Sequence, residues 1–160
     1  MIRYLFSSIK EAEIFARYSE NCPKGAITVV GEKAENMGDF EDDVLVNIGY
    51  AVGNRVPVGA LIEPMCAMNE EKHEAIRINS LLPIERRVCF TVDEFGKEPV
   101  REYPSIYDRE LFNIAIKPHK KLYSVKIVGD RIDDGSMGKI DLVEMWKVAI
   151  GYIAEYLKEE

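Results

Sequence analysis

The sequence has few of the residues that build disulfide frameworks and metal centres. Its 160 residues include only three cysteines and two histidines. Cys22, Cys66 and Cys89 are odd in number and widely separated, which fits neither a disulfide framework nor a zinc site. We therefore expect buried, reduced thiols, and we predict no metal and no cofactor.

Positive charge and long apolar runs are also scarce. The chain carries 21 Lys and Arg against 28 Asp and Glu, a formal net charge of −7, so it offers no basic face to phosphate backbones or anionic lipid. No apolar run approaches the roughly 20 residues of a membrane-spanning helix, and the N-terminus leads into a short strand rather than a signal peptide. We therefore expect a cytoplasmic protein without nucleic-acid or membrane partners.

Hydrophobic residues, in contrast, are sufficient for one core. They make up 47% of the sequence, and the length fits a single domain over residues 1–160. Strand patterns cover residues 2–6, 26–30, 44–48, 58–62, 87–92 and 122–128, and helical patterns cover residues 9–18, 106–116 and 140–157. This alternation predicts an α/β fold with three layers, in which helices cover a mainly parallel, mixed central sheet.

Ligands in such sheets bind beyond the carboxyl ends of the strands, so the residues that follow each strand pattern are candidates for a site. Glu11 and Glu13 follow the first strand, the glycine-flanked segment 49–53 interrupts the third, Phe95 follows a later one, and Asp130 follows the last. Asp and Gly also form turns, so the carboxylate of Asp130 is either a turn former or a reagent.

Five blocks of the sequence resemble, in order, the purine nucleoside phosphorylase and nucleosidase superfamily. They cover roughly half of the chain and read SSIKEAE, VNIGYAVGNRVPVGALIEP, FTVDEF, YDRELFNIA and VKIVGDRID. The pattern is most similar to methylthioadenosine/adenosylhomocysteine nucleosidases and futalosine hydrolases. The resemblance implies a shortened member of this superfamily with no cofactor, a purine nucleoside similar to methylthioadenosine as substrate, and a homodimer or other homo-oligomer.

The resemblance also implies two catalytic carboxylates. Cleavage of an N-ribosidic bond passes through an oxocarbenium-like sugar, so the leaving base needs a proton and water must reach the anomeric carbon. Asp130 matches the acid that serves the purine N7, whereas Asp133 and Asp134 are expected in a solvated loop. Glu11 matches the residue that activates the water, and Glu13 is the competing alignment.

The substrate-binding residues implied by the resemblance lie in the other blocks. Glu110 matches the glutamate that accepts hydrogen bonds from both ribose hydroxyls, and Phe95 matches the aromatic ring that stacks on the base. Gly49 and Ala51 match the backbone turn beneath base and sugar. Arg109 replaces a methionine, and could pair with Glu110, fill the pocket or recognise an acidic substituent. From the residues alone, Glu110 could equally be a solvated helix residue and Phe95 a core residue.

The sequence favours hydrolysis over phosphorolysis. The phosphorylases hold phosphate with arginines in the first loop and just before the glycine of the turn. Here, Asn47 and the arginine-free block SSIKEAE occupy those places. The alternatives are a phosphorylase, a nucleoside-binding protein without turnover, to which Arg109 and Tyr50 point, and a different reaction on the same fold.

Overall fold

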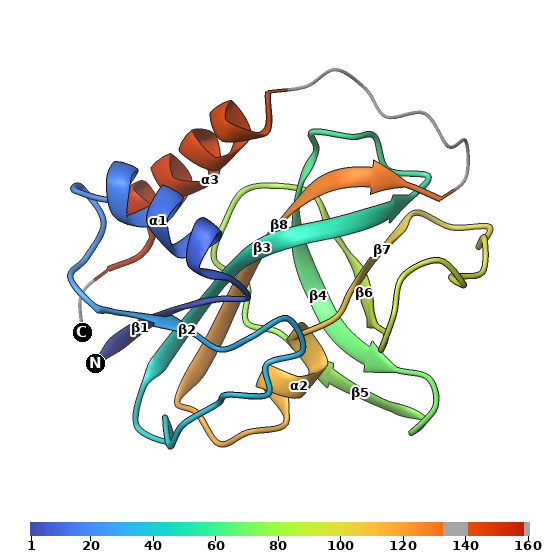
Figure 1. The fold of residues 1–160 in the computed structure, drawn as a ribbon, viewed down its shortest axis with the longest axis horizontal. Coiled ribbons are helices and arrows are strands. Elements are labelled where there is room, and N and C mark those ends of the chain that lie inside the picture. The colour runs from blue at the N-terminus through green and yellow to red at the C-terminus, as the bar shows by residue number, and fades with distance from the viewer. Residues whose placement is uncertain (133–140, 159–160) are drawn as a thin grey trace.

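A mixed sheet of eight strands organises the part of the chain that the structure describes, residues 1–132 and 141–158 of a computed structural model. Three helices in these segments accompany the sheet (Figure 1). In chain order the elements are β1 (Ile2–Phe6), α1 (Ile9–Tyr18), β2 (Ala26–Val29), β3 (Val44–Asn54), β4 (Leu61–Asn69), β5 (Glu74–Arg77), β6 (Arg86–Thr91), β7 (Ser105–Asp108), α2 (Leu111–Ala115), β8 (Lys121–Arg131) and α3 (Leu142–Tyr156).

The strand pairings are mainly parallel, as predicted. β1 pairs with β2 and β3, β3 with β8, β4 with β6, and β6 with β7, all in parallel. Antiparallel pairs join β3 to β7, β4 to β5 and β4 to β8. The pairings of β3, β7, β6, β4 and β8 close a circuit, so this part of the sheet curls into a barrel-like ring while β1 and β2 extend from it.

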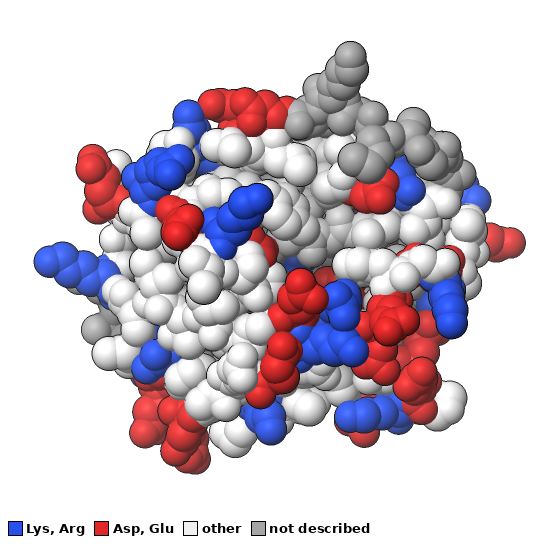
Figure 2. Space-filling view, viewed as in Figure 1, with Lys and Arg blue, Asp and Glu red and all other residues white. Residues whose placement is uncertain are grey.

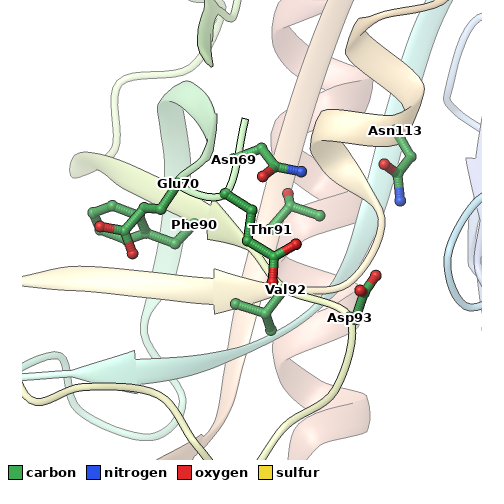
Figure 3. A pocket seen from close by; sticks show the side chains of 8 residues that line it. Asn69, Glu70, Phe90, Thr91, Val92, Asp93 and Asn113 are labelled. Carbon is green, nitrogen blue, oxygen red and sulfur yellow. The ribbon is translucent and has the colours of Figure 1, made fainter. Parts of the chain in front are cut away.

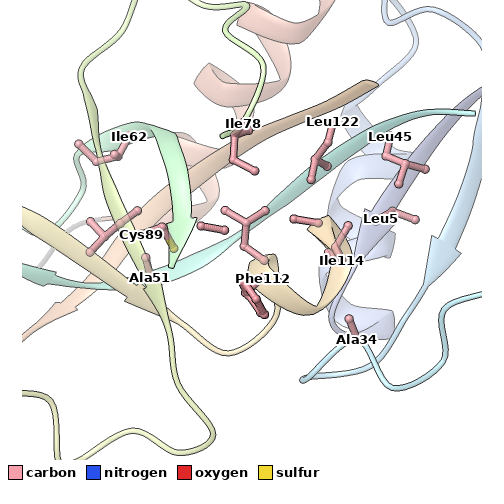
Figure 4. Packing of buried hydrophobic residues seen from close by; sticks show 14 of the residues in the cluster. Leu5, Ala34, Leu45, Ala51, Ile62, Ile78, Cys89, Phe112, Ile114 and Leu122 are labelled. Atoms are coloured by element: carbon pink, nitrogen blue, oxygen red, sulfur yellow. The ribbon is translucent and has the colours of Figure 1, made fainter. Parts of the chain in front are cut away.

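Two hydrophobic cores lie on opposite sides of the sheet. Helices α1 and α3 cover one face (Figure 1). Phe6, Phe15 and Trp146 are almost completely buried in the core on this side. The other core packs α2 against the ring and includes Phe112 and Leu122 (Figure 4). This arrangement confirms the predicted three-layer α/β fold.

Local sequence signals account for the two longer helices. Ser8 caps α1 by accepting a hydrogen bond from the Glu11 amide at 3.3 Å, and Asp141 caps α3 by accepting bonds from the amides of Val143 and Glu144. The helix predicted over residues 140–157 is observed as α3 and is buried where it meets the core, at Trp146, Ala149, Ile150 and Ile153.

Three secondary-structure predictions were wrong. Of the strand predicted over residues 58–62, only residues 61 and 62 belong to a strand, which is β4. Residues 106–116 do not form one helix, because β7 occupies Ser105–Asp108 and α2 covers only Leu111–Ala115. Residues 49–53 do not interrupt the third strand, because β8 pairs with β3 from Val44 to Gly53 and holds this segment extended. In the latter two places, pairing with distant strands overrides the local pattern.

The cysteine prediction was correct in part. Cys22, Cys66 and Cys89 are all free thiols, but only Cys89 is buried. Cys22 and Cys66 are half-buried, and burial raises the pKa of both thiols above the ordinary value.

Acidic and basic side chains are interspersed on the face of the molecule seen in Figure 2. The two charge types lie side by side mainly toward the lower right of this view, and a broad area left of the centre carries neither. Within residues 1–132 and 141–158, no helix has both the length and the apolar character needed to cross a membrane.

Candidate active site

The sheet topology brings two distant loops together at Gly49. β8 occupies one edge of β3 along residues 44–53, so β1 and β7 share the other edge. β1 runs parallel along residues 44–47 of β3, and β7 runs antiparallel along residues 52–54. The two strands therefore approach the middle of β3 from opposite directions, and the residues that follow each of them meet there.

A pocket of about 150 Å³ opens at this meeting point. Four of its lining residues were predicted for the site, and the other three are a serine, a glutamate and a tyrosine. Its lining residues are Ser7, Glu11, Glu32, Tyr50, Phe95, Arg109 and Glu110. The topology thus assembles residues from β3, α1 and four separate loops into one small site.

Glu11 is fixed by the loop that precedes its own helix. Its Oε2 accepts hydrogen bonds from the hydroxyls of Ser7 and Ser8, the latter at 2.8 Å. Its Oε1 is buried and has no hydrogen-bond partner in the described part of the chain. A buried, unpaired carboxylate oxygen at a pocket is unusual, and it is available to a ligand or water. Glu13, the competing residue, is exposed on α1 and does not line the pocket.

Glu110 is held by Asn47 rather than solvated. The side-chain amide of Asn47 donates to Glu110 Oε2 at 3.1 Å and contacts the carbonyl oxygen of Leu5 at 3.4 Å. Its own oxygen accepts a 2.9 Å hydrogen bond from Ser124. Asn47 and Ser124 are buried and Asn47 does not line the pocket, so the amide orients Glu110 from behind.

Gly49 allows the polar groups to converge. A Cβ built on Gly49 would lie 3.2 Å from Glu110 Oε1, 3.2 Å from Lys126 Nζ and 3.6 Å from Glu11 Oε1. The carboxyl groups of Glu11 and Glu110 therefore point to the same spot. Any side chain at this position would crowd the cluster, so the glycine is needed for close approach.

Lys126 is the main residue of the cluster that the sequence analysis missed. Its side chain is completely buried, and Nζ lies 2.9 Å from Asp108 Oδ2 and 3.3 Å from Glu110 Oε1. The available signal was a lysine between Val125 and Ile127 in an apolar strand pattern, because a buried lysine requires a carboxylate partner. Among the described residues, no His, Cys, Asp and Glu cluster is suited to a metal ion.

The pKa of Glu110 is raised from 4.5 to about 7. Burial is the largest cause, and the negative charges of Asp108 and Glu11 raise the pKa further. Lys126 and the Asn47 hydrogen bond act in the opposite direction. The Glu110 carboxyl can therefore gain or lose a proton near neutral pH.

Arg109 pairs across the pocket mouth, and not with Glu110. Its Nη1 lies 3.0 Å from Glu32 Oε2, and its Nε donates to the carbonyl oxygen of Asp93 at 2.9 Å. Of the three roles considered for this arginine, pairing with Glu110 is not observed. The Arg109 side chain lines the pocket, and the carboxylate of Glu32 neutralises its positive charge.

Two other predicted residues lie outside the pocket lining, and a third lies at its rim. Asp130 is half-buried near the end of β8, and its Oδ1 accepts a 2.8 Å hydrogen bond from the Arg131 amide. Ala51 is buried in the ring core. Phe95 lines the pocket and is 46% exposed, so its ring is not a core residue. Asp133 and Asp134 lie outside the described residues.

A larger pocket, of about 200 Å³, lies beyond the end of β6 (Figure 3). Asn69, Thr91, Asp93 and Asn113 are among its lining residues. None of the residues predicted for the site lines it. Its acidic side chains, such as Glu70 and Asp93, are exposed, so it lacks the buried carboxylates of the smaller pocket.

The fold is similar to that of several solved nucleosidases and a nucleoside phosphorylase. A 5′-methylthioadenosine/S-adenosylhomocysteine nucleosidase (MTAN) from Campylobacter jejuni matches with a TM-score of 0.61 and 11% identity, over 96% of each chain. An MTAN from Chlamydia trachomatis bound to MTA matches with a TM-score of 0.58 and 10% identity, over 96% of this chain and 91% of that one.

A uridine phosphorylase from Schistosoma mansoni, isoform 2, matches with a TM-score of 0.63 and 10% identity, over 98% of this chain and 85% of that one. No protein-family model and no curated protein matches the sequence. Because the matches to solved structures span nearly the whole chain, we conclude that it has the α/β fold of the nucleoside phosphorylase and nucleosidase superfamily.

Proposed function

We propose that the protein is a nucleosidase-type hydrolase that cleaves the N-ribosidic bond of a purine nucleoside similar to methylthioadenosine. The observation that carries the proposal is the convergence of Glu11 and Glu110 at Gly49, inside a pocket of the fold that MTANs share. A carboxylate pair beside one sugar can both hold its hydroxyls and activate water.

Glu11 is the residue that activates the attacking water. Its Oε1 is buried and unpaired, so it can accept a proton from a water molecule in the pocket. Ser7 and Ser8 hold the other oxygen, and this fixes the direction of the carboxylate. The hydroxyls of Ser7 and Ser8 occupy Oε2 of Glu11, so Oε1 remains available to the water molecule.

Glu110 accepts hydrogen bonds from the ribose hydroxyls. Its carboxyl lines the pocket and is oriented by Asn47 on one oxygen and by Lys126 on the other. A carboxylate has about four acceptor positions, so it can bind these neighbours and still accept from a sugar. Phe95, at the rim, supplies an aromatic surface for the base.

Asp130 is the acid in this proposal because the resemblance implies that role; it lies near the end of β8, outside the pocket lining. It lies four residues beyond Lys126, which corresponds to about 13 Å along a strand. The register between β3 and β8 shifts at Ala51 and Val52, opposite this part of β8. Such a bulge re-aims the side chains that follow it, here that of Asp130.

The charges at the pocket favour water over phosphate as the nucleophile. Glu11, Glu32 and Glu110 all line the pocket and would repel an anion. Arg109 is the lining cation, and Glu32 balances its charge. Lys126 is completely buried and is shared between two carboxylates, so it is not presented to a phosphate.

The decisive experiment is a product analysis with a panel of purine nucleosides. We expect free base and free ribose or its 5′-substituted form, at a rate that added phosphate does not change. A sugar 1-phosphate as the main product would instead support the phosphorylase alternative. Binding without base release would support a non-catalytic nucleoside-binding protein.

A homodimer is part of the same proposal, because the resemblance implies one. In its support, the edge strand β2 exposes Ile27 and Val29, which are 44% and 36% accessible. Edge strands with exposed apolar side chains are prone to pair with another chain. Sedimentation equilibrium measures the mass directly, and a monomer at all concentrations would contradict this part.

A further inference from the structure

Lys126 connects the pocket to a second carboxylate that lies deeper in the protein. Asp108 is completely buried, and its Oδ1 accepts a 2.7 Å hydrogen bond from the Thr91 hydroxyl. Its Oδ2 accepts a 2.8 Å bond from the Leu111 amide and lies 2.9 Å from Lys126 Nζ. The same Nζ lies 3.3 Å from Oε1 of Glu110. The ammonium group is therefore shared between an interior carboxylate and one that faces the pocket.

We propose that Lys126, whose ammonium group contacts both Asp108 and Glu110, is a positioning residue. It orients the Glu110 carboxyl toward the pocket and sets the charge of that carboxyl. The role of Glu110 in sugar binding rests on the proposed function. The contacts that carry the inference exist without any substrate.

The orientation follows from the two ends of the Glu110 carboxyl. Lys126 lies beside Oε1 and Asn47 donates to Oε2, so each oxygen has its own fixed neighbour. Lys126 is fixed in turn by Asp108, which Thr91 and the α2 backbone hold. A carboxyl held at both oxygens by buried groups is prepared for a ligand before the ligand arrives.

The charge follows from the groups that surround Glu110. The charged groups that act on it are Lys126 from β8, Asp108 from β7 and Glu11 from α1. Cys89 from β6 lies beside Asp108 and Lys126, and burial raises its pKa well above the ordinary value, so this thiol is neutral. One ammonium group thus serves two carboxyl groups, those of Asp108 and Glu110, and the charge of Glu11 acts on Glu110 as well; burial and these charges together raise the pKa of Glu110 to about 7.

This arrangement makes opposite predictions for two neighbouring substitutions. Lys126→Met removes the positive charge and should raise the pKa of Glu110. Asp108→Asn removes a negative charge and should lower the pKa of Glu110. Its one oxygen can still accept the hydrogen bond of the Leu111 amide, and its NH2 group can donate to the hydroxyl oxygen of Thr91. A residue that only filled space would not produce shifts of opposite sign. Lys126→Arg keeps a cation and should leave the titration close to that of the parent.

The experiment is a pH titration of side-chain carboxyl groups by carbon-13 NMR in the full chain labelled at glutamate. The Glu110 signal is identified by its loss in Glu110→Gln. Arg3→Met is the matched control, because it removes the Arg3–Asp43 ion pair at the far end of β1 and should leave the Glu110 signal unchanged. No substrate is needed, so the readout stands even if the parent releases no base and the proposed function fails.

Each outcome decides the inference. Opposite shifts in folded Lys126→Met and Asp108→Asn, with no shift in Arg3→Met, support it. Unchanged Glu110 titration in either folded variant overturns it. If both fail to fold, Lys126→Gln, which lacks the charge but keeps a polar end, replaces Lys126→Met, and an unchanged Glu110 titration in that variant overturns the proposal. In an active enzyme, the pH profile of kcat/KM should move with the same variants.

Discussion

The indole Nε1–H of Trp146 donates a 2.7 Å hydrogen bond to the hydroxyl oxygen of Tyr50, which joins helix α3 to a wall of the pocket. The two rings also meet edge-on, with centroids 5.7 Å apart. Trp146 is completely buried, whereas Tyr50 is half-buried and lines the site. A residue near the C-terminus thus fixes one side of a pocket whose carboxylates come from other elements.

Tyr50→Phe should destabilise the fold without closing the pocket. The substitution leaves the buried Trp146 donor without its partner, which costs about 1–3 kcal/mol of unfolding free energy. Urea unfolding measures the change. Tyr103→Phe is the control, because Tyr103 is 48% exposed and its loss of a hydroxyl should have little effect. Equal stability of parent and Tyr50→Phe would mean that the hydrogen bond contributes nothing.

Asp130→Asn should stop base release while nucleoside binding stays within about tenfold of the parent, because the proton donor is lost and the shape is kept. The asparagine oxygen can still accept the Arg131 amide hydrogen bond, so the end of β8 should remain intact. Chromatographic detection of free base measures the rate, and calorimetry measures binding. Full turnover in this variant would remove Asp130 from the mechanism.

Glu110→Gln should weaken the binding of ribonucleosides more than the binding of 2′-deoxynucleosides. The amide replaces one acceptor oxygen by a donor, so charge-assisted bonds to the ribose hydroxyls, worth about 1.5 to 3 kcal/mol each, are weakened or lost. Affinity for the ribonucleoside should fall about tenfold or more, since about 1.4 kcal/mol corresponds to one decade. The deoxynucleoside, which never makes the full pair of bonds, should lose much less.

Binding is best measured above the pKa of Glu110, where the parent carboxyl is ionised. The circular dichroism spectrum of the variant must match the parent, because Glu110 also contacts Lys126 and Asn47. Equal losses for both sugars in a well-folded variant would show that Glu110 does not read the ribose.

The raised pKa of Glu110 should make folding stability depend on pH. Between the ordinary value of 4.5 and about 7, the folded chain keeps a proton on Glu110 that the unfolded chain has released. The contribution of Glu110 to the free energy of unfolding is therefore largest below pH 4.5, and it falls as the pH rises to about 7. Glu110→Gln has no such group, so the unfolding free energy of the parent relative to the variant should decrease by up to about 3 kcal/mol between about pH 4 and pH 8.

Denaturant unfolding at several pH values measures this difference. The sign is opposite to that of a carboxylate stabilised by an ion pair, whose contribution is lost at low pH. A difference between parent and variant that stays constant over this range would contradict a raised Glu110 pKa.

The elements that depend on local signals could be predicted from the sequence. Helix α1 begins and ends at the predicted residues, because Ser8 supplies the cap and the apolar spacing is helical over the whole segment. The first strand was also predicted with its observed bounds. The resemblance directed attention to Glu11, Glu110, Arg109 and Phe95, which the structure places around one pocket.

The meeting of these residues was decided only by the tertiary structure. Glu11 follows β1 and Glu110 follows β7, and the two come together because both strands pair with the same edge of β3 on either side of Gly49. No local pattern encodes which edge a strand will join. For the same reason, residues 106–116 suggested a helix, although distant strands hold their first part extended.

The sequence by itself determined the α/β class, the bounds of α1 and the kinds of side chain available for chemistry, because these depend on short-range periodicity and residue type. Only the tertiary structure decided the partners: Lys126 with Asp108 and Glu110, and Arg109 with Glu32. The charge of a buried carboxyl depends on which groups the fold places around it, and such contacts join residues far apart in the chain.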